Sequence, residues 1–424
     1  MKSLAFVTLG LTATSCLLAQ EVVTNAPAKS FWEYDMLTGD WGGARSRLTQ
    51  AGVDFSPVYT GEVFSDVSGG KYGTGTVYDH SLNLPLTLDL EKLAGWKSAT
   101  IHANAFWIAG QSLTENCVGD LANVSNISGN PALRLQELWL QQDGWQHTVS
   151  LKAGLIAVDS EFFTATSAAL FINGSFGAFP LFGANLPNPP VYPMAAPAVR
   201  LLVQPCPRFY FQTAVFDGNA GTQTGNPSGT DFPLSTADGA LIFSEMGWLP
   251  PPEAGTNHLA TTFKVGNFIH TKRVPTWDSQ AAGNTGGGSA NFGFYAVIEQ
   301  DLFRRAESKI TAFIRGGYAP PDRNVVDWYL DVGLNFTGFI PGRAEDVAGI
   351  ALARSNFSPD YNRYEQSVEG GTAFNSELIL EATYRAQILP WWTLQPDLQY
   401  IITPGGDSSC RDAVVIGLRT TINF

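Results

Sequence analysis

Alternation of apolar and polar side chains is the dominant pattern of this chain, and it is clearest near the end. From residue 378 to 388 the even-numbered positions are apolar and most odd-numbered positions are polar. The same alternation returns in residues 392–402 and 414–424, and the chain stops on Phe424. A two-residue period places alternate side chains on opposite faces of a β-strand, so each segment is predicted to be a strand with one apolar and one polar face.

Strands of this kind occur in two sorts of barrel. A soluble barrel turns the apolar face inward, whereas an outer-membrane barrel turns it to lipid and keeps the polar face on a wet lumen. The polar face here is charged and continuous, which favours the membrane barrel. The lumen would then be lined by Asp327, Asp331 and Asn335, because a charged group at the bilayer midplane costs about 2 to 4 kcal/mol.

Counting the alternating windows predicts an all-β transmembrane antiparallel barrel of about 16 strands, an even number typical of bacterial barrels. The windows begin near Val53, Thr76, Ser98, Pro131, Trp145, Pro197, Arg208, Gly239, Asn257, Ala290, Glu307, Val325, Asp346, Ser376, Trp391 and Arg411. Around 133–141 the alternation slips by one residue, which predicts a β-bulge near Glu137.

Long and short connectors alternate between these windows, as in barrels with short periplasmic turns and long outer loops. Residues 65–75 and 111–130 form long connectors, whereas 91–97 and 142–144 form short ones, so both chain ends are expected on the short-turn side. The third outer loop, 157–195, is the longest and is rich in Phe, Pro and Gly. Its apolar content argues against disorder, and we predict that it folds into the barrel and narrows it.

The N-terminus predicts export. Met1 and Lys2 precede an apolar stretch that ends at Ala19, which is typical of a signal peptide over residues 1–19, although residues 13–16 also weakly resemble a lipoprotein site. We expect residues 20–52 to form an N-terminal segment and residues 53–424 an outer-membrane barrel domain. The segment 41–52 has helical spacing and ends at Gly52, a plausible C-cap, so a short helix is expected at the periplasmic mouth.

Composition excludes several functions. A net charge of −13 without a basic cluster argues against nucleic-acid binding. The five histidines are dispersed, no cysteine spacing matches a metal site, and residues 173–177 do not form a GxSxG motif. We therefore expect a protein that is not an enzyme and needs no cofactor or metal, with a barrel-embedded hydrolase as the rival from another class.

Several spaced motifs carry a family resemblance. They are LTGDWGG at 37–43, PPDRN at 320–324, PGR at 341–343, QPDLQYI at 395–401 and PGG at 404–406. Together they resemble the carbohydrate-selective porins of the OprB family, from about Asp35 to Phe424. The resemblance implies a 16-stranded outer-membrane barrel that admits monosaccharides such as glucose by facilitated diffusion.

A sugar is neutral, dense in hydroxyls and apolar on its ring faces, so a selective pore needs charged hydrogen-bonding arms and aromatic plates. The inward candidates, each of which is alternatively part of an ion-pair network in the wall, are Arg134, Glu137, Lys152, Arg315, Asp331, Glu381 and Arg385, with Trp139 as a plate. In the mouth helix, Arg45 and Arg47 either line the path or hold a structural plug by ion pairs.

The expected partners are a carbohydrate solute, outer-membrane lipid and the barrel-assembly machinery, which we expect to read the terminal strand ending at Phe424. Two further alternatives stay open. The barrel is either a general small-solute porin without sugar selectivity or a structural or adhesive barrel whose third loop plugs the bore.

Overall fold

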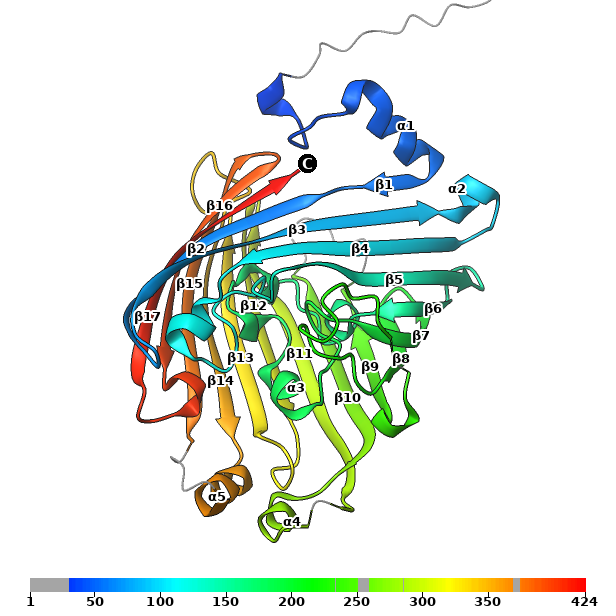
Figure 1. The fold of residues 1–424 in the computed structure, drawn as a ribbon. Helices are drawn as coiled ribbons and strands as arrows, with labels where there is room; N and C mark the ends of the chain where they lie inside the picture. Colours follow the sequence, from blue (N-terminus) through cyan, green and yellow to red (C-terminus); the bar gives the residue numbers. More distant parts are fainter. Residues whose placement is uncertain (1–29, 233, 251–258, 285, 369–373) are drawn as a thin grey trace, which may run out of the picture.

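The computed structural model describes residues 30–232, 234–250, 259–284, 286–368 and 374–424 and shows a closed antiparallel β-barrel (Figure 1). Over these residues, seventeen strands form one sheet that closes where β17 pairs with β2 and β9 with β10. The short β1 (Val53–Phe55) and β2 (Val58–Gly70) both pair with β3 (Gly75–Asp89). They form one barrel strand interrupted before Pro57, whose ring removes a backbone donor. The barrel wall therefore has sixteen strands, β2 to β17, as predicted.

The remaining strands follow in chain order around the wall. They are β4 (Ala99–Gly110), β5 (Ala132–Gly144), β6 (Val149–Ile156), β7 (Ala196–Cys206), β8 (Phe209–Asp217), β9 (Ala240–Trp248), β10 (Thr261–Val274), β11 (Ser289–Arg305), β12 (Ser308–Tyr318), β13 (Val326–Thr337), β14 (Val347–Phe357), β15 (Ser376–Leu389), β16 (Trp392–Ile402) and β17 (Arg411–Asn423). The α-helices are α1 (Ala44–Ala51), α2 (Leu90–Ala94), α3 (Pro180–Asn185), α4 (Trp277–Ala281) and α5 (Pro359–Val368). Shorter 3-10 or π turns are η1 (Phe31–Glu33), η2 (Trp41–Gly43), η3 (Thr114–Val118), η4 (Val158–Ser160), η5 (Ala168–Leu170), η6 (Gly174–Phe176), η7 (Thr236–Asp238) and η8 (Pro404–Gly406).

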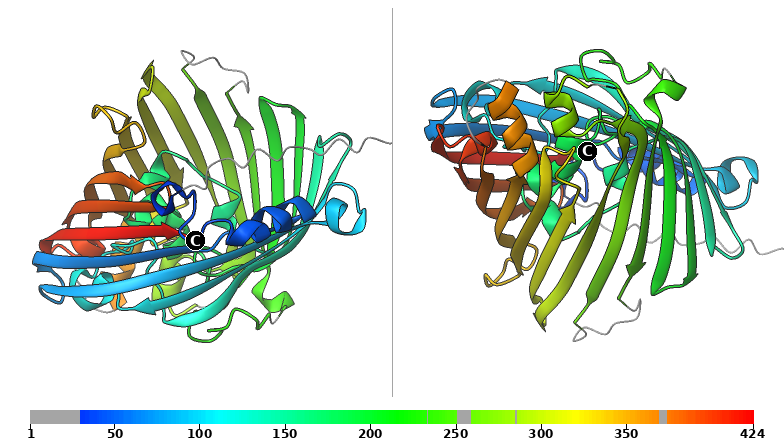
Figure 2. Two further views of the ribbon diagram at one scale, coloured as in Figure 1. Left: turned by 90° about the horizontal axis from the view of Figure 1, so that it is seen from above. Right: turned by 90° about the horizontal axis from the view of Figure 1, so that it is seen from below.

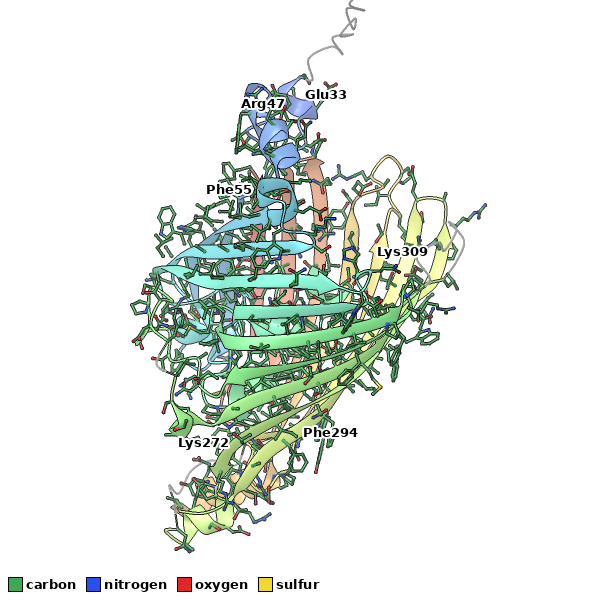
Figure 3. The ribbon with its side chains drawn as sticks, turned by 90° about the vertical axis from the view of Figure 1, so that its right-hand side faces the viewer. Glu33, Arg47, Phe55, Lys272, Phe294 and Lys309 are labelled. Atoms are coloured by element: carbon green, nitrogen blue, oxygen red, sulfur yellow. The ribbon has the colours of Figure 1, made fainter. Side chains whose placement is uncertain are left out.

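The alternating pattern separates the two faces of the wall. On β16 the outward Leu398 is 48% exposed, whereas its neighbour Gln399 is fully buried inside the barrel. Phe294, 57% exposed, projects from the outer face (Figure 3). Asp331 and Glu381 are buried on the inner side. The apolar row faces outward and the polar row lines the interior, as the alternation predicts.

Asp327 is an exception, because the prediction that it faces the lumen is wrong. The register between β13 and β14 shifts between Val326 and Trp328, and Asp327 lies at this irregularity. Its carboxylate accepts a hydrogen bond from Nδ2 of Asn356 at 2.8 Å, on the outward row of β14. A single bulge residue inverts the two-residue alternation, which explains the error.

The two ends of the barrel differ in their connections. The inner end carries the described start of the chain and Phe424, and the opposite, outer end carries α4 and α5 (Figure 1). We number the outer connections loops 1 to 8: residues 71–74, 111–131, 157–195, 218–239, 275–288, 319–325, 358–375 and 403–410.

Loop 1 is much shorter than predicted. Residues 65–70 continue β2, because that strand stays paired with β17 through register shifts that end at Gly70 opposite Arg411. Gly69 and Gly70 have positive φ, and their presence hides the strand pattern in the sequence. The predicted bulge near Glu137 is confirmed, because the register between β4 and β5 skips Gln136 there.

The N-terminal segment lies outside the barrel at its inner end. α1 ends at Gly52, which has a φ of 96° and caps the helix in the left-handed conformation, as predicted. Leu37 N donates to the carbonyl oxygen of Asn423 at 2.8 Å, which ties this segment to the end of β17. The predicted signal peptide, residues 1–19, lies outside the described residues. Within the described ranges, no helix is long and apolar enough to cross a membrane.

Candidate functional site in the lumen

Loop 3 folds into the barrel, as its composition predicts. Figure 2 views the barrel from both ends and shows this segment, in green, inside the ring of strands. Its Phe163 and Phe182 are buried with ring centroids 4.7 Å apart. Phe182 also meets Phe268 of β10 at 5.5 Å, and Phe162 meets Phe243 of β9 at 5.4 Å. Each buried ring contributes about 1.5 to 3 kcal/mol, so this cluster seats one side of loop 3 firmly on the wall.

Wall carboxylates on several strands hold the backbone of loop 3. Glu245 on β9 accepts from Phe163 N at 2.8 Å, and Glu299 on β11 accepts from Ser167 N at 2.7 Å. Glu381 on β15 accepts from two successive backbone groups, Ile172 N at 2.6 Å and Asn173 N at 3.0 Å. Buried backbone N–H groups need acceptors, and a loop inside a barrel has no ladder partner. Glu381, predicted as a sugar arm, is placed here as a loop anchor.

Arg315 and Asp331, both predicted candidates, are brought together on neighbouring strands. The Arg315 guanidinium donates to both carboxylate oxygens of Asp331 through Nε at 3.0 and 3.2 Å and through Nη2 at 2.5 Å. It also donates to the carbonyl oxygens of Ser175 and Gly177 in loop 3. Tyr329 OH completes the cluster by donating to Asp331 and Ser175, each at 2.7 Å. Both charges are buried, and their contacts fasten loop 3.

Lys152, Glu137 and Trp139 gather at the start of loop 3. Lys152 forms an ion pair with Glu161, which Arg200 also contacts at 3.1 Å. Glu137 accepts from the backbone N of residue 157 at 3.0 Å. Lys152 lies 3.7 Å from the centroid of Trp139, whose ring also stacks with His102, 4.9 Å away. Lys152 and His102 approach from the strands on either side of β5, so this indole is already flanked by protein groups.

Arg134 lies farther out on β5 and is almost fully buried. It donates to Sδ of Met194 at 2.8 Å and to the carbonyl oxygen of Gln223 at 2.9 Å, so it joins loops 3 and 4.

Loop 2 also enters the lumen and packs beside loop 3. Leu121 N donates to Glu377 of β15 at 2.7 Å, and Gln399 of β16 donates to the carbonyl oxygen of Val124 at 3.0 Å. Asn126 accepts from Arg419 of β17 at 2.6 Å and donates to the Phe171 carbonyl at 3.2 Å. The two loops therefore form one inward body anchored on several strands.

Burial shifts the acidity of two loop carboxyls. Burial raises the pKa of Asp159 in loop 3 to about 6, although its hydrogen bond from Tyr192 N works in the opposite direction. Burial, together with the nearby Glu377, raises the pKa of Asp120 in loop 2 well above its usual value. Both groups are stabilised in their protonated form because burial removes most of the water around them.

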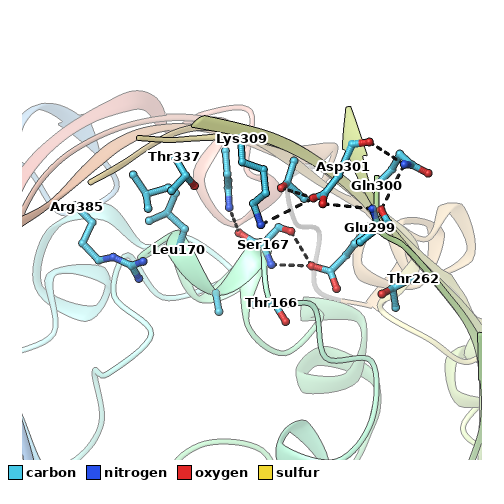
Figure 4. A pocket seen from close by; sticks show the side chains of 15 residues that line it. Thr166, Ser167, Leu170, Thr262, Glu299, Gln300, Asp301, Lys309, Thr337 and Arg385 are labelled. Carbon is cyan, nitrogen blue, oxygen red and sulfur yellow. Dashed lines mark hydrogen bonds and ion pairs between the residues drawn. The ribbon is translucent and has the colours of Figure 1, made fainter. Parts of the chain in front are cut away.

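Arg385 has a different environment from the other candidate cations. It lines a cavity of about 450 Å³ at the inner end of the lumen, between residues 166–170 of loop 3 and the wall. Figure 4 shows this cavity, with Glu299 and Asp301 on the far side from Arg385 and Lys309 between the two sides. No hydrogen bond or ion pair joins Arg385 to any other described residue. Five hydroxyl side chains also line this cavity, which we call the inner pocket: Thr166, Ser167, Thr262, Thr311 and Thr337.

Arg45 and Arg47 lie outside this region. Arg47 and Glu33 are above the barrel in the N-terminal segment (Figure 3). Arg45 lies 4.4 Å from the Trp41 ring centroid and donates to Thr38 at 3.1 Å. Both arginines therefore lie outside the lumen, at the inner end of the barrel.

Comparison with known proteins identifies the family. The model of the carbohydrate-selective porin family, OprB, matches residues 74–424. This chain belongs to the OprB family. Porin B of Pseudomonas aeruginosa is 26% identical over 92% of this chain and 91% of its own length. The OprB structure of Pseudomonas putida at high pH matches with a TM-score of 0.84 at 24% identity, covering 93% of this chain and all of that one. Salmonella typhi OmpF matches more distantly, with a TM-score of 0.52 at 10% identity over 89% of this chain and 99% of that one.

This member of the family is thus a channel of the bacterial outer membrane and not an enzyme. Sequence reasoning missed several inward charged residues, among them Glu161, Glu245, Glu299 and Lys264. Glu245 shares its face with Leu241 and Phe243, so its strand does not show a clean polar row. A signal did exist for Glu161, because it and Asp159 are the only charged residues in the whole of loop 3.

Proposed function

We propose that this porin admits monosaccharides such as glucose into the periplasm by facilitated diffusion. The family supports a carbohydrate solute, and the inner pocket supports a monosaccharide in particular. Its hydroxyl groups, carboxylates and free guanidinium offer both donors and acceptors within a space of about 450 Å³. A sugar hydroxyl both donates and accepts, so a wall with both functions suits it better than a wall of one charge sign.

Transport limits how tightly the solute is held. A channel has to release its solute, so the expected affinity is near millimolar, about −4 kcal/mol, and nanomolar binding would block it. The ion-paired groups around loop 3 fix the shape of the lumen. The sugar forms its transient contacts in the inner pocket.

Liposome swelling over a series of sugars tests this function. Vesicles containing the purified porin should swell faster in glucose than in a disaccharide, and planar bilayers should show stepwise conductance that glucose partly reduces. Empty vesicles and vesicles with a family-unrelated general porin are the controls. Equal rates for all solutes of one size, with no reduction of current by glucose, would leave the general-porin alternative. Absence of conductance would favour a plugged structural barrel.

We also propose that the outward apolar row contacts membrane lipid and that the assembly machinery recognises the last strand. The Phe424 backbone N donates to the carbonyl oxygen of Pro57 at 2.9 Å, so its removal costs one contact at the barrel seam. Deletion of Phe424 should lower the amount of folded porin in the outer membrane. Refolding of the purified variant in detergent serves as the control, because normal refolding with poor assembly in cells separates recognition from stability. Normal outer-membrane yield would refute the recognition.

A further inference from the structure

The charged side chains of the inner pocket differ in whether they already have hydrogen-bond or ion-pair partners in the protein. Oε1 of Glu299 accepts from both the backbone N and the hydroxyl of Ser167, each at 2.7 Å. Asp301 accepts from Arg304 at 2.7 Å and from Thr311 at 2.8 Å, and Lys309 lies 3.8 Å from it. Each carboxylate of the pocket therefore already has donors from the protein.

Arg385 has no such acceptor among the described residues, although other buried cations of the lumen do. Lys152 and Arg200 share Glu161, Arg315 binds Asp331, Lys264 donates to Thr164, and Arg419 pairs with Glu62. The neighbouring inward residue Gln395 also has partners of its own, because its amide donates to Thr383 and to the Leu170 carbonyl. The guanidinium of Arg385 thus presents its donors to the pocket.

A planar guanidinium binds a carboxylate with two parallel hydrogen bonds, a stronger contact than it makes with a neutral hydroxyl. The hydroxyl groups of the pocket suit the remainder of a polyol. We infer that the inner pocket is a subsite for sugar acids, in which Arg385 binds the carboxylate and the Thr and Ser side chains form hydrogen bonds with the solute's hydroxyl groups. This inference rests on the proposed function and narrows its solute class.

Three solutes with the same carbon skeleton provide the test. Gluconate carries a carboxylate where glucose carries its anomeric carbon, and sorbitol is the uncharged open-chain polyol of the same length. Block of the ion current by the three solutes, each added on the periplasmic side at 0.1 M salt, therefore separates the effect of the charge from that of ring opening. In the wild-type porin, gluconate should block at a concentration about tenfold lower than glucose or sorbitol, which corresponds to about 1.4 kcal/mol. Acetate, which lacks the polyol, should not block at these concentrations.

Variants assign the effect to Arg385. Gluconate and glucose should block the R385Q channel equally. The R385K channel keeps the positive charge but loses the two parallel hydrogen bonds, so it should retain part of the preference for gluconate. R363Q is the matched control, because Arg363 lies on the outer helix α5 and pairs with Asp360 there, and it should behave as wild type. Salt gives a measurement that needs no variant, since raising it to 1 M shortens the Debye length from about 10 to about 3 Å and should reduce the preference.

The outcomes separate the two proposals. Equal block by gluconate and glucose in the wild type, an unchanged preference in R385Q, or block by acetate alone would overturn the sugar-acid subsite while leaving sugar passage intact. Failure of both sugars to block or to swell vesicles, with normal conductance, would overturn the proposed function itself.

Discussion

Arg315 and Arg385 face the same lumen from β12 and β15, yet the structure uses them differently. Arg315 is 2% exposed and donates to Asp331 and to two carbonyl groups of loop 3. Arg385 lines the inner pocket, and no described residue accepts a hydrogen bond from it. The residue type and the face of the strand are the same. An arginine that loop 3 covers stabilises the fold, whereas an arginine that loop 3 leaves open to the lumen can bind the solute.

Stability should show this difference most strongly. Replacing Arg315 with Ala leaves Asp331 buried without its cation, so the free energy of unfolding should fall by about 3 to 5 kcal/mol. Arg385→Ala removes no protein partner and should change it by less than about 1 kcal/mol. Urea unfolding in phospholipid vesicles, followed by tryptophan fluorescence, measures both variants. Similar losses for the two would contradict the distinction between a structural and a solute-facing arginine.

Glu381 extends the comparison to the loop backbone. Glu381→Gln keeps the shape of the side chain but loses the charge that accepts from Ile172 N and Asn173 N, so we expect a loss of about 1.5 to 3 kcal/mol. The loosened loop should also make the open-channel current noisier. Glu307→Gln, at an exposed inner turn, is the control. A quiet channel of normal stability would show that Glu381 is not an anchor.

Much of the architecture follows from the sequence because the wall repeats a two-residue period. The strand starts and the bulge near Glu137 follow from that period, whereas the inward course of loop 3 follows from the length and apolar content of the loop. The predictions for Asp327 and loop 1 failed where a bulge or paired glycines interrupt the period. At such points the alternation no longer indicates which face a residue occupies, although the backbone hydrogen bonds between the strands continue on either side.

The lumen was less predictable than the wall. Alternation places Arg315, Glu381 and Arg385 inside, but it does not tell which of them loop 3 reaches. Glu381 lies 209 residues along the chain from its partner Ile172. Pairings of this kind depend on the path of loop 3, which has few charged residues and no periodic pattern. The sequence therefore indicates the candidate arms, and the fold is needed to separate anchors from free donors.

The stability of the protein should depend on pH through Asp159 in loop 3. Burial raises the pKa of Asp159 to about 6, above its usual 3.8, so the folded protein binds this proton more tightly than the unfolded chain. The contribution of this group to stability is therefore full below about pH 4 and is lost as the pH rises through 6. Asp159→Asn stays neutral and can still accept from Tyr192 N.

The variant should consequently match wild type at pH 4 and exceed its stability at pH 7 by an amount on the order of 1 kcal/mol, because Asp159 retains some contact with solvent. Unfolding titrations of both proteins over pH 4 to 7 give this difference directly. A difference that does not change with pH would show that Asp159 titrates normally in the fold.

The mouth segment should have the smallest effect on solute binding. Arg45 is held by Trp41 and Thr38, and Arg47 lies above the barrel, so neither reaches the inner pocket. Arg45→Ala and Arg47→Ala should change the half-blocking concentration of glucose by less than about twofold, which is below about 0.4 kcal/mol. Arg385→Gln, measured in parallel with gluconate, shows whether the assay detects the loss of a contact. A larger effect of either mouth variant would mean that solute passes against α1, and sugar recognition would then extend beyond the barrel to its periplasmic entrance.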